Sequence, residues 1–166
     1  MKTIILYATR HGAAKEIAEK IASQWEGATL CDLQQNANPS LDEFDCVIIG
    51  GPLYARNLLK PVKDYARSQE PALLEKRLGL FLSGLGAEGA DRFFNTNFPH
   101  SLLKKATVKA FIGGIYDPAR CNWAEKLIMK AITRIQRLPV PANTIREDRI
   151  TAFIAELKAE TASGEA

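Results

Sequence analysis

Four short, unbroken apolar segments constrain the fold of this 166-residue chain more than any other feature of its sequence. None of them alternates polar with apolar residues, as a strand with one solvated face should. Runs of this length that end near glycine are typical of parallel strands covered by helices on both faces. The segments are TIILYA (3–8), CVIIGG (46–51), LGLFLSG (78–84) and VKAFIGG (108–114).

Helical patterns separate these segments. A weaker strand, ATLCDL (28–33), lies between the first two. The alternation of strands and helices predicts an α/β fold, a doubly wound parallel sheet with helices on both faces. Amphipathic spacing predicts helices over 13–25, 58–68, 88–105 and 145–160, the third of them broken by a proline.

Two helix starts have local signals. Asn57 suits the N-cap of the second helix, with Pro61 tolerated in the first turn. Thr144 and Glu147 have the spacing of a capping box before the last helix, in which each side chain bonds a free amide.

Composition is that of an ordinary soluble globular domain, with 46% apolar and 25% charged residues. The length favours one domain, which we expect to span 1–160, with an insertion at 115–143 and a fraying tail at 161–166. No apolar run approaches the ~20 residues that span a bilayer. We interpret the start, MKTIILYATR, as a first strand and not as a signal peptide.

Charge and cysteine content narrow the partners. The net charge is +3, too small to indicate nucleic acid binding, although it weakly favours an anionic ligand or surface. The 3 cysteines are far apart and form no CxxC pair, so we expect reduced thiols in a cytoplasmic protein. With only 2 histidines, we expect no metal site.

Three loops follow the carboxyl ends of the predicted strands, where open doubly wound sheets bind their ligands. In the first, residues 9–14, free amides at a helix start attract an anion, assisted by the Thr9 hydroxyl and by Arg10 and His11. An ordinary turn with basic surface residues is the alternative.

The second loop, residues 51–57, presents Tyr54, whose ring either stacks on a flat ligand or packs on a neighbouring helix. The third, residues 84–89, is rich in glycine and offers backbone groups, although it also suits a plain turn before a helix. Together the three loops indicate a ligand with a phosphate at one end and a flat heteroaromatic ring at the other.

Other nucleotide and phosphate proteins are disfavoured. The dinucleotide fingerprint GxGxxG and the P-loop GxxxxGK[ST] are absent. A phospho-receiver of the same topology needs acidic residues at the ends of the first and third strands. This chain has Thr9-Arg10 and Gly50-Gly51-Pro52 there.

These residues resemble the flavodoxin family, which binds FMN in the same three loops. The stretches TRHGAAKEIA and DCVIIGGPLYARNLLKPVKDYA carry the likeness. A further stretch, FIGGIYDPARCNWAEKLIMKAI, resembles the long-chain branch that contains menaquinone-dependent protoporphyrinogen IX dehydrogenase. The resemblance implies a flavodoxin-like sheet of five parallel strands in the order 2-1-3-4-5, an inserted helix before the last helix, and FMN as cofactor.

The resemblance also implies which residues contact FMN. The first loop matches the phosphate loop, the second flanks the flavin ring with Tyr54 as stacking partner, and the third follows the other edge of the ring. Family members usually have hydroxyls where this chain has Ala14 and His11, which predicts weaker binding. The implied contacts are Thr9, Arg10, His11, Gly12, Ala13, Ala14, Pro52, Leu53, Tyr54, Ala55, Arg56, Asn57, Ser83, Gly84, Leu85, Gly86, Ala87 and Glu88.

Three functions stay open. The first is an FMN-dependent oxidoreductase that passes electrons from a porphyrinogen to a quinone, in haem biosynthesis. The second is an electron carrier for a redox protein, and the third is a binding module with a weakened FMN site. Arg10 and Arg56 would stabilise a reduced, anionic flavin, so we expect it to accept electrons more readily than in acidic flavodoxins.

No general acid or base can be assigned from the sequence. Glu88, Tyr116 and Asp117 lie near the expected mouth of the site, and each also suits a surface loop.

The inserted helix within 123–137 has a basic arc beside an apolar arc, with Trp123 near its entrance. Such a helix could lie on an anionic membrane, at the inner face of the cell membrane. The more common arrangement is an apolar face packed on the sheet with only the basic side solvated, and this is the expectation here. The basic residues are Lys126, Lys130, Arg134 and Arg137, and the apolar ones are Leu127, Ile128, Ala131, Ile132 and Ile135.

Overall fold

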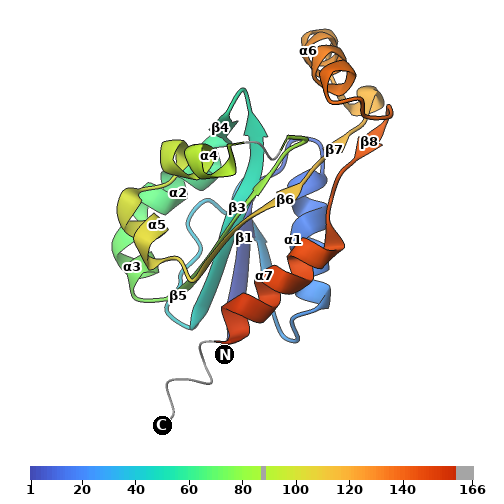
Figure 1. Cartoon of the computed structure of the whole chain (residues 1–166). Coiled ribbons are helices and arrows are strands. Elements are labelled where there is room, and N and C mark those ends of the chain that lie inside the picture. The colour runs from blue at the N-terminus through green and yellow to red at the C-terminus, as the bar shows by residue number, and fades with distance from the viewer. Residues whose placement is uncertain (87–88, 160–166) are drawn as a thin grey trace.

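A parallel sheet forms the centre of the computed structural model, which describes residues 1–86 and 89–159 (Figure 1). Its parallel strands lie in the predicted order, β2-β1-β3-β5-β6, and the short β4 pairs antiparallel with the end of β3. The strands are β1 (Thr3–Tyr7), β2 (Thr29–Asp32), β3 (Cys46–Tyr54), β4 (Asn57–Leu58), β5 (Arg77–Ser83) and β6 (Val108–Gly113).

Burial explains why the apolar runs were clear and ATLCDL was weak. Every residue of β1 is buried, and so are the first seven residues of β3, because helices cover both faces of the sheet. Strand β2 lies at the sheet edge, and none of its residues is fully buried. An edge strand needs fewer apolar residues than a central one, so its sequence signal is weaker.

Helices form a layer on each face of the sheet (Figure 1). Helices α1 and α7 cover one face, and α2, α3, α4 and α5 cover the other. Their bounds are α1 (Ala13–Ser23), α2 (Lys60–Ser68), α3 (Glu70–Leu74), α4 (Ala90–Asn97), α5 (His100–Lys105) and α7 (Glu147–Ala159).

The predicted helix starts were partly right. Pro61 lies in the first turn of α2, as expected, and the break before α5 falls at Phe98 and Pro99. The assignment of Asn57 as an N-cap was wrong, because Asn57 pairs with Tyr54 in the β3–β4 hairpin and Leu59 precedes α2.

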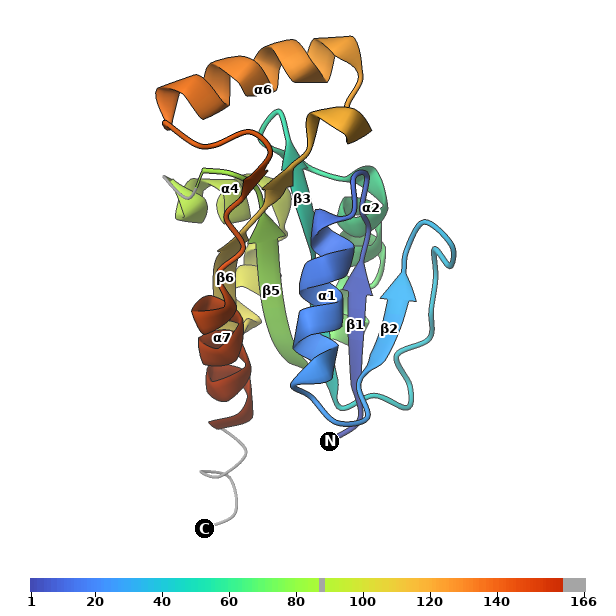
Figure 2. The ribbon, with the colours of Figure 1, turned by 90° about the vertical axis from the view of Figure 1, so that its right-hand side faces the viewer.

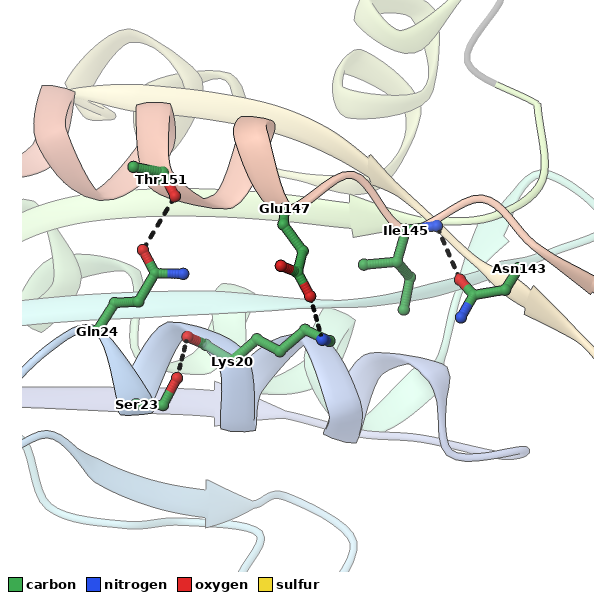
Figure 3. Close-up of polar contacts among 7 residues, drawn as sticks. All are labelled: Lys20, Ser23, Gln24, Asn143, Ile145, Glu147 and Thr151. Carbon is green, nitrogen blue, oxygen red and sulfur yellow. Dashed lines mark hydrogen bonds and ion pairs between the residues drawn. The ribbon is translucent and has the colours of Figure 1, made fainter.

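The capping box predicted for α7 was wrong as well. The Thr144 hydroxyl accepts a hydrogen bond from the Gly114 amide (3.1 Å) and so faces the insertion instead of α7. Glu147 instead pairs with Lys20 of α1 (2.6 Å), and the Thr151 hydroxyl donates to the Gln24 side chain (3.0 Å). These contacts join α7 to α1 on the same face of the sheet (Figure 3).

The predicted insertion is a structured excursion from the sheet. Strands β7 (Ile115–Tyr116) and β8 (Ala142–Asn143) pair antiparallel, so the segment leaves and returns at one place. Between them lie a 3-10 helix, η1 (Pro118–Arg120), and the helix α6 (Trp123–Ile135). Helix α6 lies across the carboxyl ends of the strands (Figure 2).

Candidate functional site

The candidate site lies at the carboxyl edge of the sheet, next to the point where the strand order reverses. From β1 the chain continues through α1 to β2 on one side, whereas β3 lies on the other side of β1. The loops after β1 and β3 therefore diverge to opposite faces of the sheet, which is where ligands of such sheets bind.

The loop after β1 presents unpaired backbone amides. Gly12 precedes α1 with φ of 94°, a conformation that glycine adopts without strain, and its amide donates to the Thr9 hydroxyl (2.9 Å). Within the described residues, the amides of Ala13, Ala14 and Lys15 have no acceptor. Three free donors at the positive end of a helix form an anion site without any side chain.

Two basic side chains of this loop contact a carboxylate from the insertion. Arg10 Nη2 lies 2.7 Å from Glu125 Oε1, and His11 Nε2 lies 3.3 Å from Oε2. Among residues 1–86 and 89–159, neither His11 Nε2 nor Glu125 Oε1 has a partner with hydrogen-bond geometry, although both atoms are buried. The carboxylate thus offsets positive charge of the loop, but it leaves buried polar atoms of this contact without hydrogen bonds.

Glu125 is ionised at neutral pH. The Asn122 amide donates to its carboxylate (2.9 Å) and lowers the pKa of Glu125, and Arg10 and His11 act in the same direction against partial burial. Asn122 and Glu125 together form a capping box at the start of α6.

The second loop is a tight hairpin that presents Tyr54. Ala55 and Arg56 have positive φ (46° and 67°), as a two-residue hairpin turn requires. The Arg10 guanidinium lies 5.3 Å from the Tyr54 ring centroid, and the His11 ring meets it edge-on at 5.8 Å. Burial raises the pKa of Tyr54 well above its ordinary value, so the phenol stays protonated.

The third loop approaches the C-terminal end of α6. Ser83 is fully buried and its hydroxyl has no partner within the part of the chain that the structure describes. The Gly84 amide donates to the Gly113 carbonyl (3.1 Å). A Cβ atom at Gly86 would lie 2.7 Å from Gln136 Nε2, so that side chain already occupies the space above Gly86.

The insertion therefore bridges the first loop and the third (Figure 2). Near its start, Arg120 Nη1 donates to the His11 carbonyl (3.0 Å) and Glu125 contacts Arg10 and His11. Near its end, Gln136 lies against Gly86. Sequence reasoning missed these four contacts, although the N-x-x-E spacing of Asn122 and Glu125 was a readable helix start.

The exposure of α6 overturns the expectation that its apolar face packs on the sheet. Trp123 is 80% exposed, Leu127 66%, Ile128 61% and Ile135 81%, and only Thr133 of this helix is buried. The body of the protein contacts a different side of the helix, the one with Glu125 and Gln136. Within 1–86 and 89–159, no helix is long and apolar enough to cross a bilayer.

Two residues predicted near the mouth have structural contacts. The Asp117 carboxylate accepts from the Ala119 amide (2.9 Å) and caps η1, and Tyr116 is buried in β7. Neither contact assigns a proton-transfer role.

His11, Cys121 and Glu125 place potential metal ligands within 4.8 Å of one another. Arg10 lies against the same carboxylate, and a cation there would be repelled by the guanidinium. Burial and the nearby Glu125 raise the pKa of Cys121, which keeps the thiol protonated and so a poor ligand.

Those predicted contact residues that the structure describes lie at this one edge of the sheet but differ in what they can offer a ligand. Ala13, Ala14, Pro52 and Ser83 are buried, and the alanines expose only their amides to a ligand. Ala87 and Glu88 lie outside the described residues. The exposed or half-buried members are Thr9, Arg10, His11, Gly12, Leu53, Tyr54, Ala55, Arg56, Asn57, Gly84, Leu85 and Gly86.

Comparison with known proteins gives a family and a fold. The family model described as a flavodoxin domain matches residues 4–139. A short-chain flavodoxin associated with a bacterial microcompartment is 18% identical, with a TM-score of 0.59 over 98% of this chain and 99% of its own. Flavodoxin from Fusobacterium nucleatum, solved with flavin mononucleotide, is 17% identical, with a TM-score of 0.54 over 96% and 99%.

Oxidised flavodoxin 2 from Bacillus cereus is 20% identical, with a TM-score of 0.54 over 83% of this chain and 100% of its own. Identities this low support the shared fold and no finer likeness. No functionally curated protein matches the chain in sequence.

Proposed function

Because the chain belongs to the flavodoxin domain family, we propose that it binds FMN and acts as an FMN-dependent oxidoreductase. The anion site after β1 is the observation that carries the proposal. Free amides at the start of α1, with Arg10 and His11 beside them, suit the phosphate of FMN. The FMN-bound flavodoxin of Fusobacterium nucleatum has the same fold.

The other two loops would hold the flavin ring. Tyr54 offers an aromatic surface beside the hairpin turn. The third loop contributes the half-buried Gly84 and Gly86, and the Gln136 side chain, which occupies the space above Gly86, would have to make room for the ring. A bound flavin supplies the redox chemistry, whereas the chain binds it, orients it and sets the charge around it.

A flavin titration tests this function directly. FMN fluorescence should change on addition of the protein, and riboflavin, which lacks the phosphate, should bind more weakly. Equal binding of FMN and riboflavin would mean that the loop after β1 holds no phosphate, and absence of binding by either would dispose of the flavoprotein assignment.

The finer proposal is oxidation of a porphyrinogen with a quinone as acceptor. It is supported by the resemblance of the insertion to the protoporphyrinogen dehydrogenase branch. It is also supported by Arg10 and Arg56, whose charges favour a reduced, anionic flavin. Turnover of protoporphyrinogen IX with a menaquinone analogue tests it, and a flavin potential as low as in acidic flavodoxins would contradict the electrostatic part.

Two alternatives keep specific support. An electron carrier for a redox protein uses the same fold and cofactor, and it would reduce or oxidise a partner protein without turning over a porphyrinogen. A binding module with a weakened FMN site is favoured by Ala14 and by the Glu125 carboxylate against Arg10 and His11. A colourless purified protein that stays colourless with excess FMN would favour the module.

We also propose that the protein is cytoplasmic and that α6 contacts anionic lipid at the inner face of the membrane. The apolar residues of α6 are exposed beside a row of exposed basic residues, which matches an apolar interior under negative headgroups. Anionic vesicles should pellet the protein at low salt and release it at high salt. Neutral vesicles are the control, and equal pelleting with both would refute the charge match.

A further inference from the structure

We propose that Glu125 is a specificity-determining residue of this site, because its carboxylate competes with the ligand's phosphate for Arg10 and His11. The inference rests on the proposed flavin function. It predicts that the need to displace Glu125 lowers the affinity for a ligand with a phosphate and leaves the affinity for a ligand without one unchanged. It also couples the phosphate to the position of the inserted segment, 115–143.

The charges of the loop support competition. Arg10 and His11 are basic side chains of the loop that carries the free amides of α1, and both contact the same carboxylate, at 2.7 and 3.3 Å. Arg120 also reaches this loop, where its Nη1 donates to the His11 carbonyl (3.0 Å). A phosphate that binds those amides and also Arg10 and His11 would bring a second anion to the side chains that now pair with the carboxylate, and two anions so close repel each other. Because the helix fixes the amides, and the amides hold the phosphate, the Glu125 carboxylate is the group that must move.

The present contacts are also incomplete. His11 Nε2 and Glu125 Oε1 are buried without a hydrogen-bond partner in the part of the chain that the structure describes, which is unusual for buried polar atoms. A phosphate has more acceptor oxygens than a carboxylate and can reach the amides as well as the side chains. A phosphate can therefore accept more hydrogen bonds from this loop than the Glu125 carboxylate does.

The Glu125 carboxylate can move away from Arg10 and His11 without disturbing the hydrophobic core. Helix α6 buries only Thr133. Within the described residues, the inserted segment also contacts the body through the Arg120–His11 hydrogen bond and the approach of Gln136 to Gly86. The β7–β8 pairing anchors the segment at its base. Displacement of Glu125 thus breaks a polar contact between α6 and the first loop and leaves the apolar layers on the sheet intact.

Linkage makes the effect reciprocal. If phosphate weakens the attachment of α6 by some factor, the attached α6 weakens phosphate binding by the same factor. Riboflavin has no phosphate, so its affinity does not depend on the position of Glu125. Glu125 therefore narrows the preference of the site for FMN over riboflavin.

Glu125→Gln is the sharpest test, because glutamine keeps the shape and can still serve the capping box with Asn122. We expect FMN to bind this variant roughly ten-fold more tightly than the wild type, within the usual range of coupled sites, and riboflavin to change much less. Glu43→Gln, which removes an equal charge from an exposed pair with Lys2, should change neither affinity.

A second measurement follows the segment itself. Trypsin should cut the exposed basic residues of α6 faster in wild type with FMN or inorganic phosphate than without, whereas Glu125→Gln should be cut fast in both conditions. This readout needs no redox activity.

The outcomes separate the two proposals. If FMN binds the wild type and Glu125→Gln with equal affinity, the competition is wrong and the flavin function stands. If neither flavin binds either protein but inorganic phosphate still speeds cleavage of α6, the competition stands and the flavin function falls. If both affinities rise or fall together, Glu125 acts structurally and the inference is overturned.

Discussion

Helices α6 and α7 have 13 residues each and both place apolar residues at helical spacing, yet they attach to the protein in opposite ways. Helix α7 buries Ile150, Phe153, Ile154 and Leu157 against the sheet and α1. Helix α6 buries only Thr133 and touches the body through polar groups near its two ends.

The difference teaches that an apolar helical stripe does not identify what covers it. In α7 the stripe stabilises the fold, and the ion pair and hydrogen bond to α1 add to it (Figure 3). In α6 the stripe faces away from the sheet and is free for another surface, while the polar side reaches the candidate site. Stability and ligand control are thus divided between two helices of equal length.

The largest expected effect is loss of the α7 core. Phe153→Ala should lower the free energy of unfolding by about 3–5 kcal/mol, because Phe153 is 1% exposed and its removal leaves a cavity beside β5. Urea unfolding followed by circular dichroism measures this. A loss below about 1 kcal/mol would mean that α7 is held as loosely as α6.

A smaller effect is expected where α7 lies closest to the sheet. A Cβ atom at Gly79 would lie 2.8 Å from Phe153 Cζ and 2.9 Å from Leu157 Cδ2. Gly79→Ala should therefore overpack the interface and lower the free energy of unfolding by about 1–3 kcal/mol. An unchanged urea midpoint would show that α7 shifts freely on β5, contrary to a close-packed contact.

Cysteine labelling compares the body with the insertion. Cys46 is fully buried in β3 and Cys121 is half-buried beside α6, so a thiol reagent at pH 8 should modify Cys121 roughly ten-fold faster or more. The comparison uses a Cys31→Ser background, because Cys31 is half-buried as well, and Cys121→Ser in that background identifies the fast thiol. Equal rates for both cysteines would contradict the difference in burial.

The buried thiol of Cys46 makes the stability of the protein depend on pH. Burial raises the pKa of Cys46 to about 11, from 9.0. The unfolded chain therefore releases the proton first, and the stability that depends on the neutral thiol is full below about pH 9 and is lost as the pH rises toward 11. Unfolding curves between these pH values measure it, with Cys46→Ala lacking this share of the pH dependence.

The smallest effect is expected on α6. Ile128→Ala should change the free energy of unfolding by less than about 0.5 kcal/mol, because the side chain is 61% exposed and alanine favours helices. Urea unfolding at two protein concentrations checks it. A loss of more than about 1.5 kcal/mol that depends on concentration would show that a second copy covers this face.

The sequence predicted the parallel strands well because β1, β3 and β5 are buried on both faces, and uniform burial produces uninterrupted apolar runs. It did not predict β4, since the hairpin turn places Ala55 and Arg56 at positive φ, where glycine or asparagine would have been the signal.

The three loops of the candidate site were proposed from the sequence, whereas the Glu125 carboxylate beside the first loop was not anticipated. The amides after β1 follow from a strand-to-helix turn, which is local information. The pairing of Glu125 with Arg10 depends on the path of the insertion across the sheet edge, and nothing within a few residues of either side chain encodes that path. The outward-facing stripe of α6 is unpredictable for the same reason.

The base of the insertion has a consequence for how this protein can change. The Thr144 amide donates to the Gly114 carbonyl (2.8 Å), so the residues that bracket the excursion already touch. A short splice between them would close the chain without disturbing α7 or the sheet. We therefore expect that the insertion can be shortened, lengthened or replaced, in evolution or by protein engineering, while the flavodoxin framework stays the same.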